Sequence, residues 1–474
     1  MITEPIQTSF SGNTYTDALL WGGWHWDDPA AAPGAPTVIN YFLDAYLGTP
    51  WHAAEAAAIE RAFQTWSNVA NITFVRVYDA SSAQLIERLV TETQLPGTLG
   101  EHGTPDSAAT VGGDYDGALL LGANNQAYGY FNYQAFSPGS FAKGGYDLVT
   151  LIHELGHGLG LAHPHDDGGG SPVFPGVTIY NDADLGANNL NQGLYTVMSY
   201  NDGWASFQDP VGNGLTRYGY ESGPMAFDIA AIQYLYGANT TSHSGNDVYI
   251  LPAANAVGTS WTCLWDTGGV DLIAYAGARN VQIDLRAATL DNSASGGGLV
   301  SYAKGIYGGY TVAQGVTIEN ASSGRGNDVL IGNQVANVLI SGGGKDVLYG
   351  GDGGDSLWGG QGADRLFGGA GNDAFVFSTR FSAVNIDRIG DFQSATDKIY
   401  LNHAIFAHAG LIGDLDGSAF HVGARAADNN DHIIYRPGTG DLIYDTNGRA
   451  AGGAHVFAHI HAGTAISASD FYIF

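Results

Sequence analysis

A repeat of nine residues runs without a gap from Ser323 to Val376 and restricts the fold more than any other part of the chain. Its six units are SGRGNDVLI, GNQVANVLI, SGGGKDVLY, GGDGGDSLW, GGQGADRLF and GGAGNDAFV. Each unit has six turn residues rich in glycine, followed by three strand residues with an apolar centre. This pattern is typical of a parallel β-helix in which two units form one coil. Six units in phase favour this fold over the alternative, a flexible glycine-rich linker. The residues expected to fill the interior are Leu330, Leu339, Leu348, Leu357, Leu366 and Phe375.

The sixth position of each unit is an aspartate, except in the second unit, where it is Asn337. Because two units make one coil, carboxylates eighteen residues apart, such as Asp346 and Asp364, are expected to flank the same cation. Backbone carbonyls of the turn glycines would complete a shell of oxygen atoms, which calcium prefers. The second unit, with Val335 and Asn337, is expected to be a weaker position. The predicted calcium ligands in the repeats are Gly324, Gly326, Asp328, Gly342, Gly344, Asp346, Gly351, Gly353, Asp355, Gly360, Gly362, Asp364, Gly369, Gly371 and Asp373.

Charge and cysteine content exclude some partners and some means of stabilisation. Acidic residues outnumber basic ones by 46 to 17 over 474 residues, which gives a formal charge of -29. Nucleic acid and anionic membranes repel so acidic a protein, and neither is an expected partner. No apolar run approaches the roughly 18 residues that span a membrane, so no membrane insertion is expected. The single cysteine, Cys263, excludes an intrachain disulfide, and we expect a monomer stiffened by calcium instead.

The first half of the chain has a mixed pattern of helices and strands. Alternating apolar residues indicate strands, and apolar residues at helical spacing indicate amphipathic helices. Past about residue 239 the pattern changes to short strand-like runs broken by glycine. We therefore expect an α+β domain over 1–240, followed by an all-β parallel β-roll domain over 241–474. The predicted strands cover 37–44, 71–77 and 125–136, and the predicted helices cover 51–70, a segment from about Tyr146, and 224–237.

The stretch HELGHGLGLAH, from His153 to His163, has the spacing of a zinc site on a helix. His153 and His157 are four residues apart, so a helix presents both on one face. Glu154 is placed to act on a zinc-bound water rather than to bind the metal. An unbroken helix would carry His163 about 15 Å along its axis and off this face, so the helix must stop, with Gly160 as the expected turning point. Five fixed positions favour a zinc site over the alternative, a core helix with surface histidines.

Together with VMSY, residues 197–200, this stretch resembles the metzincin metallopeptidases, in which a tight turn carrying a methionine lies beneath the zinc site. More narrowly, the chain resembles the serralysins, secreted bacterial proteases built from a metzincin domain and a calcium-binding β-roll. The loop HPHDDGGG departs from that family, because His165 stands where the serralysins commonly have glycine. The resemblance covers nearly the whole chain and includes WSNVANITF (66–74), DIAAIQYLYGAN (228–239), WDTGGVD (265–271), GVTIENA (315–321) and IGDFQSATDKIYL (389–401).

The resemblance implies one catalytic zinc ion on His153, His157 and His163, with Tyr200 as a further ligand in the resting enzyme. Tyr200 would then swing away and hydrogen-bond the tetrahedral intermediate, while Met198 lies beneath the zinc. Several structural calcium ions are implied as well. Their ligands outside the repeats would be Gly245, Asp247, Asp266, Gly268, Gly269, Asp271, Thr317 and Glu319.

The implied function is that of a zinc-dependent endopeptidase of broad specificity, with Glu154 as the general base toward the attacking water. An extended substrate is expected to pair with an edge strand, which we place near residues Gln126 to Asn132. One alternative is a non-catalytic, calcium-stabilised binding or adhesion module, against which the intact Glu154, Tyr200 and histidines argue. The other is a metalloprotease dedicated to one target of the surface-layer type.

The stretch ASDFYIF, an aspartate followed by four apolar residues, resembles the uncleaved C-terminal signal of bacterial type I exporters. An ordinary hydrophobic C-terminal strand explains these residues equally well. The stretch MITEPIQTSF has neither a basic n-region nor an apolar h-region, so no Sec-type signal is expected there. We therefore expect a secreted, extracellular protein whose partners are protein substrates, the type I secretion machinery and a proteinaceous inhibitor. Calcium, scarce in the cytosol, would fold the β-roll only after export.

Overall fold

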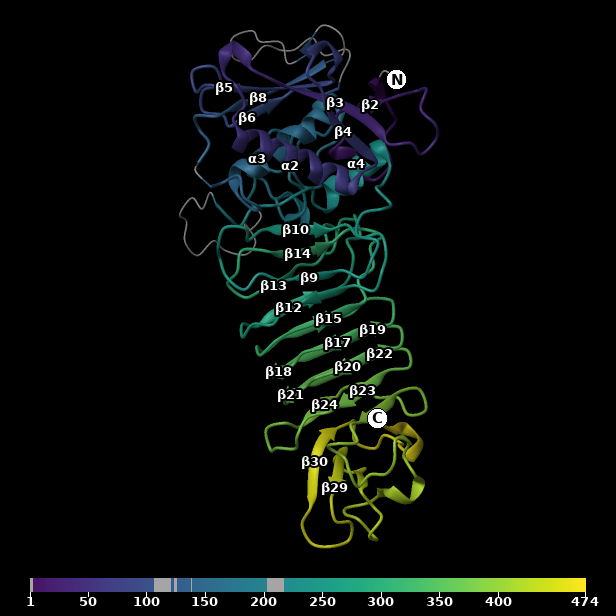
Figure 1. The fold of residues 1–474 in the computed structure, drawn as a ribbon. Helices are drawn as coiled ribbons and strands as arrows, with labels where there is room; N and C mark the ends of the chain where they lie inside the picture. The colour runs from purple at the N-terminus through teal and green to yellow at the C-terminus, as the bar shows by residue number, and fades with distance from the viewer. Residues whose placement is uncertain (1–2, 106–120, 123–125, 138, 203–216) are drawn as a thin grey trace.

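The computed structural model describes residues 3–105, 121–122, 126–137, 139–202 and 217–474. An α/β part, formed by the first half of the chain, sits at one end of a long stack of β-strands (Figure 1). One continuous hydrophobic cluster extends through both parts. The sequence predicts this succession of an α+β part and a parallel β-roll. None of the described helices is long and apolar enough to span a membrane.

The sheet of the α/β part has the order β4-β3-β5-β8-β6, with the short β7 also paired to β8. Strands β4, β3, β5 and β8 run parallel, whereas β6 and β7 run antiparallel to β8. The prediction that Gln126 to Asn132 form an edge strand is therefore wrong, because this segment lies between β5 and β6. Among the described residues β6 is the edge on this side. The bounds are β3 Thr37–Asp44, β4 Ile72–Arg76, β5 Leu85–Val90, β6 Gly100–His102, β7 Leu121–Gly122 and β8 Gln126–Asn132.

Helices α2 and α3 pack against each other, and α3 also contacts β6 and β8. On α2, buried residues recur at helical spacing, including Ile59, Phe63 and Trp66. The indole nitrogen of Trp66 donates to the carbonyl of Ile152 on α3 at 3.1 Å, which fixes the helix that carries the predicted metal ligands. The bounds are α1 Thr14–Ala18, α2 Ala53–Val69, α3 Tyr146–Gly158 and α4 Ala226–Tyr236, and β1 Glu4–Gln7 pairs with β2 Trp24–Asp27.

The repeats of the β-roll form two opposite sheets. Within each sheet, a strand pairs in parallel with the strand eighteen residues further along the chain, as the nonapeptide period predicts. Leu330 lies opposite Leu348 in one sheet, and Leu339 lies opposite Leu357 in the other. All six apolar residues at the eighth positions of the repeats are completely buried. One inward side chain per strand is therefore enough to form the core of each coil.

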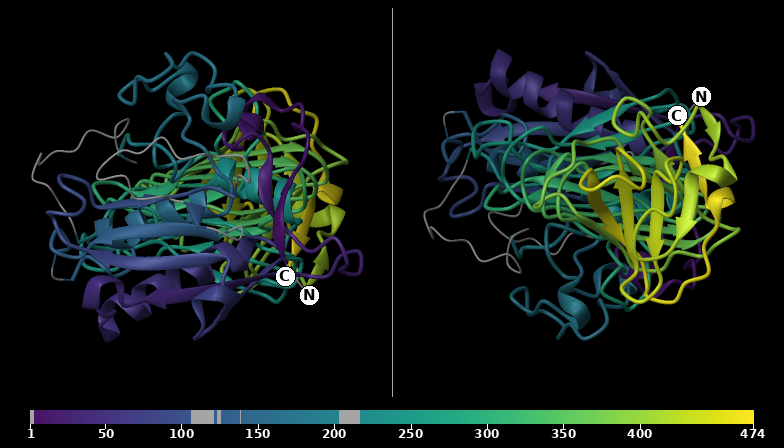
Figure 2. Two further views of the ribbon diagram at one scale, coloured as in Figure 1. Left: turned by 90° about the horizontal axis from the view of Figure 1, so that it is seen from above. Right: turned by 90° about the horizontal axis from the view of Figure 1, so that it is seen from below.

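The stack ends in antiparallel strands β28, β29 and β30, which Figure 2 shows from below at the far end of the molecule. The first sheet contains β10 Trp261–Leu264, β12 Val281–Asp284, β13 Ser301–Ala303, β14 Gly309–Val312, β16 Val329–Ile331, β19 Val347–Asp352, β22 Arg365–Ala370, β24 Asp387–Ile389, β27 Phe420–Val422, β28 Ile433–Arg436, β29 Asp441–Asp445 and β30 Ala454–His459. The second contains β9 Val248–Ile250, β11 Leu272–Ala274, β15 Asn320–Ser322, β17 Val338–Ile340, β20 Ser356–Trp358, β23 Ala374–Phe377, β25 Lys398–Leu401, β26 Gly413–Asp414 and β31 Phe471–Ile473, and β18 Gly343–Gly344 pairs with β21 Gln361–Gly362.

Candidate active site

The end of α3 determines where the third histidine lies. The amide of Leu161 donates to the carbonyl of Gly156 at 2.9 Å, which closes the helix in the manner of a glycine-terminated end. Gly160, which immediately precedes the donor Leu161, has a φ of 102°. A Cβ at Gly160 would lie 2.0 Å from the carbonyl oxygen of Trp24, so only glycine fits. The helix thus stops just before Gly160, as predicted, and the chain turns so that His163 faces the helix.

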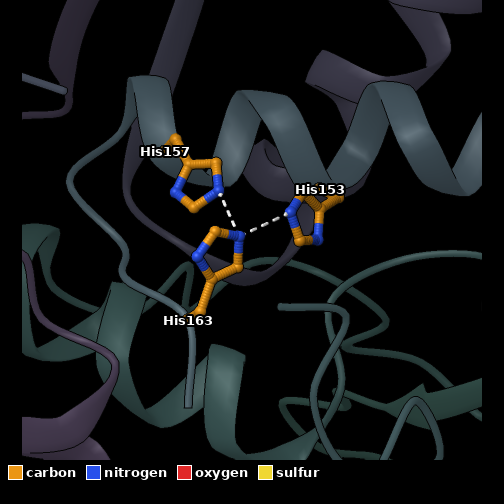
Figure 3. Close-up of side chains that lie close together, drawn as sticks. All are labelled: His153, His157 and His163. Atoms are coloured by element: carbon orange, nitrogen blue, oxygen red, sulfur yellow. Dashed lines mark hydrogen bonds between the residues drawn. The ribbon is translucent and has the colours of Figure 1, made fainter. Parts of the chain in front are cut away.

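The three predicted zinc ligands converge on one point (Figure 3). The Nε2 atom of His163 lies 3.2 Å from that of His153 and 3.0 Å from that of His157. Two of these residues come from α3, and the third comes from the segment after the turn. Three nitrogen atoms at such distances match the ligand set of a tetrahedral zinc ion that keeps one position open.

Each imidazole ring has an oxygen atom beside its Nδ1. These oxygens belong to backbone carbonyls or a carboxylate, so they accept, and Nδ1 carries the proton of the neutral ring. The Nε2 lone pairs are therefore the ones that face one another, as metal binding requires. The Nδ1 distances are 2.8 Å from His153 to Val197 O, 2.8 Å from His157 to Leu161 O and 2.6 Å from His163 to Asp166 Oδ2.

Burial keeps these rings neutral. It lowers the pKa of His153 to about 4 and holds the pKa values of His157 and His163 well below the usual range. Neutral imidazole is the form that binds zinc. The residues present therefore fit a zinc ion in both geometry and protonation.

Glu154 is buried beside His153 and borders a cavity of about 510 Å³. Burial raises the pKa of Glu154 to about 8, and His102 acts in the opposite direction. The His102 ring lies between the carbonyl of Gly103, 2.7 Å from Nδ1, and Glu87 Oε1, 3.3 Å from Nε2. Burial lowers the pKa of His102, but Glu87, the Gly103 carbonyl and Glu154 together raise it more, so the net shift is upward. The buried pair of His102 and Glu87 thus lies close enough to Glu154 for its charges to influence the pKa of that carboxyl.

Tyr200 and Met198 both lie near the histidines, in different surroundings. The ring of Tyr200 is 4.7 Å from that of His163 and 5.6 Å from that of His153, and it is exposed on the cavity side. Met198 is fully buried, and its sulfur packs against Gly156, where a Cβ would lie only 2.6 Å away. The structure thus places Met198 beneath the helix and Tyr200 at the open side of the cluster.

His165, in the loop that departs from the serralysin pattern, lies against the same cluster. Its ring stacks on that of His163, with centroids 5.0 Å apart, and lies 5.1 Å from that of Tyr200. The three nitrogen atoms that come within metal-ligand distance of one another belong to the other histidines. His165 therefore borders the site rather than joining its ligand set.

Asp228 on α4 holds the turn that carries Met198. Its buried carboxylate accepts from the Thr196 hydroxyl at 2.5 Å, the Val197 amide at 2.7 Å and the Met225 amide at 2.8 Å. Because the Val197 carbonyl accepts from His153, these bonds also set the position of a metal ligand.

The aspartates of the repeats share one arrangement. In each pair eighteen residues apart, Oδ1 of the later aspartate accepts the backbone amide of the earlier residue, as between Asp364 and Asp346 at 2.9 Å. The Oδ2 atoms are buried and have no hydrogen-bond partner within the part of the chain that the structure describes. Burial raises the pKa of Asp346 and of Asp355 to about 7, which a bound cation would reverse. These orphaned atoms fit calcium, and they belong to Asp328, Asp346, Asp355, Asp364 and Asp373.

The second repeat differs in its bonding as well as in its sequence. The side-chain amide of Asn337 donates to the Glu319 carbonyl at 2.8 Å, and its oxygen accepts from the Asn333 amide at 2.8 Å. Both ends of the side chain are thus occupied by the protein. This agrees with the expectation of a weaker calcium position.

A second acidic cluster lies where the α/β part meets the roll. Oxygen atoms of Asp247, Asp266 and Asp271 lie within 4.8 Å of one another, and Oδ2 of Asp271 has no partner among the described residues. Burial, with a smaller effect of Asp266 and Glu319, raises the pKa of Asp271 to about 6. Glu319 accepts the Asp271 amide at 2.7 Å, and the Gly245 carbonyl lies against Gly269. Of the predicted ligands, the structure thus brings together these six, with Gly268 and Thr317 in the adjoining loops.

Two residues that position the site, Asp166 and Asp228, were not predicted, and neither was the buried pair of Glu87 and His102 near Glu154. For Asp166 a signal existed, because a carboxylate three residues after His163 can reach the Nδ1 of that ring. The other three come from distant segments. Asp228 begins a stretch that carries the family resemblance, but nothing in that stretch indicates its contact with the turn at Met198.

Comparison with known proteins connects this geometry to a family. The Matrixin family model matches residues 35–175, and the model described as Peptidase M10 serralysin C terminal matches residues 227–432. The metallopeptidase AprA of Pseudomonas marginalis is 34% identical over 435 residues, which span 85% of this chain and 79% of that protein. A serralysin of Photorhabdus luminescens is 33% identical over 61% of this chain and 56% of its own length. Serralysin C of Dickeya chrysanthemi is 35% identical over 61% of this chain and 57% of its own length.

Proposed function

This chain belongs to the serralysin family of zinc metalloendopeptidases, and we propose that His153, His157 and His163 bind its catalytic zinc ion. The predicted family, fold class and cofactors, zinc and calcium, are confirmed by this membership. One observation carries the residue assignment. The Nε2 atoms of the three histidines converge on one point, and the Nδ1 atom of each ring donates to an oxygen acceptor. The zinc ion supplies a Lewis acid that polarises the scissile carbonyl and acidifies the attacking water.

Glu154 is the proposed general base. Burial raises its pKa to about 8, and a nearby dication acts in the opposite direction, so the carboxylate can accept and release a proton near neutral pH. It takes the proton of the water during attack and delivers that proton to the leaving amine.

Tyr200 is proposed as the residue that stabilises the oxyanion after leaving the resting zinc site. Its ring lies beside those of His153 and His163, and it is more than half exposed, so the ring can move. A phenolic O–H that donates to the developing oxyanion lowers the barrier of the chemical step.

The substrate would lie along residues 97–100 and β6, not along β8. Residues 97–100 line the cavity, and a Cβ at Gly100 would meet Glu154 Cγ at 2.7 Å, so backbone approaches the base closely here. An extended peptide that pairs with this edge is held through its backbone, which selects for extended chain rather than for many particular side chains.

Calcium would be held by the orphaned aspartates of the repeats and by the cluster of Asp247, Asp266 and Asp271. We place the catalytic domain at 1–240 and the calcium-binding β-roll at 241–474. A protein so dependent on calcium suits folding after secretion, and type I export, with residues 468–474 as the signal, is the proposed route. These residues end in β31, which pairs with β25 in the folded roll. A monomer, and a proteinaceous inhibitor as a further partner, complete the proposal.

The direct test is proteolysis of unfolded casein by purified protein that carries one zinc ion per chain, with calcium present. Cleavage at many sites is expected. A protein with intact zinc that leaves casein uncut would refute the catalytic assignment. Cleavage of one surface-layer-type protein in place of casein would favour the dedicated protease.

A further inference from the structure

The cavity beside Glu154 has features that zinc chemistry alone does not require. Its lining includes the start of α3, with Tyr146, Val149 and Thr150, and the segment 199–202. Its volume of about 510 Å³ lies within the range of sites that hold small ligands, so it has room for one long side chain. Its position next to the proposed general base is where a substrate side chain that flanks the cleaved bond would lie.

Glu221 lines this cavity and is only 4% exposed. Its Oε1 atom is buried and has no hydrogen-bond partner among the described residues. The backbone of Glu221 is fixed by a bridge to Trp261, and a Cβ at Gly193 would lie 2.2 Å from Oε1. The carboxyl group thus occupies space that a glycine leaves open. A buried carboxylate without a partner is unfavourable until a cation or a donor meets it.

The charged side chains that line the cavity are all acidic. The sixteen described residues that line the cavity include Glu154, Asp202 and Glu221 but no lysine or arginine. Burial, and less strongly Asp202 and Asp228, raises the pKa of Glu221 to about 8. A positively charged side chain in the cavity would reduce the repulsion between these carboxylates and donate a hydrogen bond to Glu221 Oε1.

We propose that this cavity binds a lysine or arginine side chain of the protein substrate, and that Glu221 determines this specificity. This inference rests on the proposed endopeptidase function. The guest's apolar stem would pass Tyr146 and Val149, and its cationic end would reach the carboxylate. An apolar guest would leave Glu221 buried and unpaired, and an acidic guest would add repulsion. Backbone pairing would still govern most of the binding, so the preference acts within a broad specificity.

The first test is the cleavage profile of the wild-type holoenzyme on a mixed peptide pool, read by mass spectrometry. Lysine and arginine are expected to be enriched at one of the two positions that flank the cleaved bond. Cleavage without such enrichment overturns the inference while leaving the proposed function intact. Absence of any cleavage by zinc-loaded protein would refute the proposed function itself, and the inference with it.

The second test uses two peptides that differ only in lysine or norleucine at that flanking position. In Glu221→Gln the ratio of their kcat/KM values should fall about tenfold or more, because the buried charge is lost while the shape is kept. The matched control is Glu4→Gln on β1, an exposed glutamate outside the cavity, which should keep the wild-type ratio. An unchanged ratio in Glu221→Gln overturns the inference. If that variant does not fold, the wild-type profile decides alone.

Discussion

Removal of the Asp166 carboxylate should weaken zinc binding without touching a metal ligand. Oδ2 of Asp166 lies 2.6 Å from Nδ1 of His163, and its Oδ1 accepts the Gly168 amide at 3.0 Å. The carboxylate therefore fixes both the tautomer and the orientation of His163, and the backbone bond fixes the carboxylate. Loss of such an outer partner typically costs ~10–100-fold in metal affinity, which equals about 1.4–2.7 kcal/mol. We expect Asp166→Ala to raise the Kd for zinc by that factor.

The assay is a competition titration of the metal-free protein against a chromophoric zinc chelator, at constant pH and calcium. The matched control is Asp167→Ala, which removes the same charge at the next residue. The Asp167 carboxylate accepts from the Tyr180 hydroxyl and not from a metal ligand. The control should keep the wild-type Kd. Equal Kd values for the two variants would refute the argument that Asp166 orients His163.

Three further predictions concern the core, the acidic rows and the helix end. Leu348→Ala in the calcium-loaded protein should lower the free energy of unfolding by about 3–5 kcal/mol, because the side chain is completely buried; urea denaturation that shows a loss below about 1 kcal/mol would contradict this. Burial raises the pKa of Asp346 and Asp355 from 3.8 to about 7, so the folded, calcium-free chain binds protons more tightly than the unfolded one. Because calcium must displace these protons, the calcium concentration that folds the roll, followed by circular dichroism, should rise as pH falls from about 7 to 4; a calcium requirement that does not change over this range would sink the idea. Gly160→Ala should reduce zinc occupancy, because a φ of 102° and the nearby backbone exclude a Cβ at this position. The control is Gly34→Ala, at a glycine with a φ of 79° in open space, which should retain full occupancy. Equal occupancy in the two variants would show that the turn tolerates alanine.

Periodic features of this chain could be predicted from sequence because each repeat unit makes the same contact. The eighteen-residue register between Leu330 and Leu348 follows from nine residues per half coil, and the structure has it without exception in the repeats. The end of α3 was likewise predictable, because the spacing from His153 to His163 requires a stop and Gly160 is the residue that permits it.

The edge of the sheet that lies beside the cavity could not be predicted in the same way. Strand β6 has three residues, Gly100–His102, too few to show alternation, so the sequence indicates the longer and more apolar β8 as the edge instead. The roles of Asp228 and Glu221 could not be predicted from the sequence either. Their roles depend on which segments meet in the folded chain, and a single acidic residue in a sequence does not indicate its neighbours.

Glu154 is proposed to transfer the proton at a zinc site built by three histidines. Metal analysis and casein proteolysis on the wild type and on Glu154→Ala, both with calcium, test this assignment. We expect one zinc ion per chain in both proteins, because Glu154 is not a ligand, with activity in the wild type and none detectable in the variant. A variant that keeps its zinc and still cleaves casein would remove Glu154 from the mechanism.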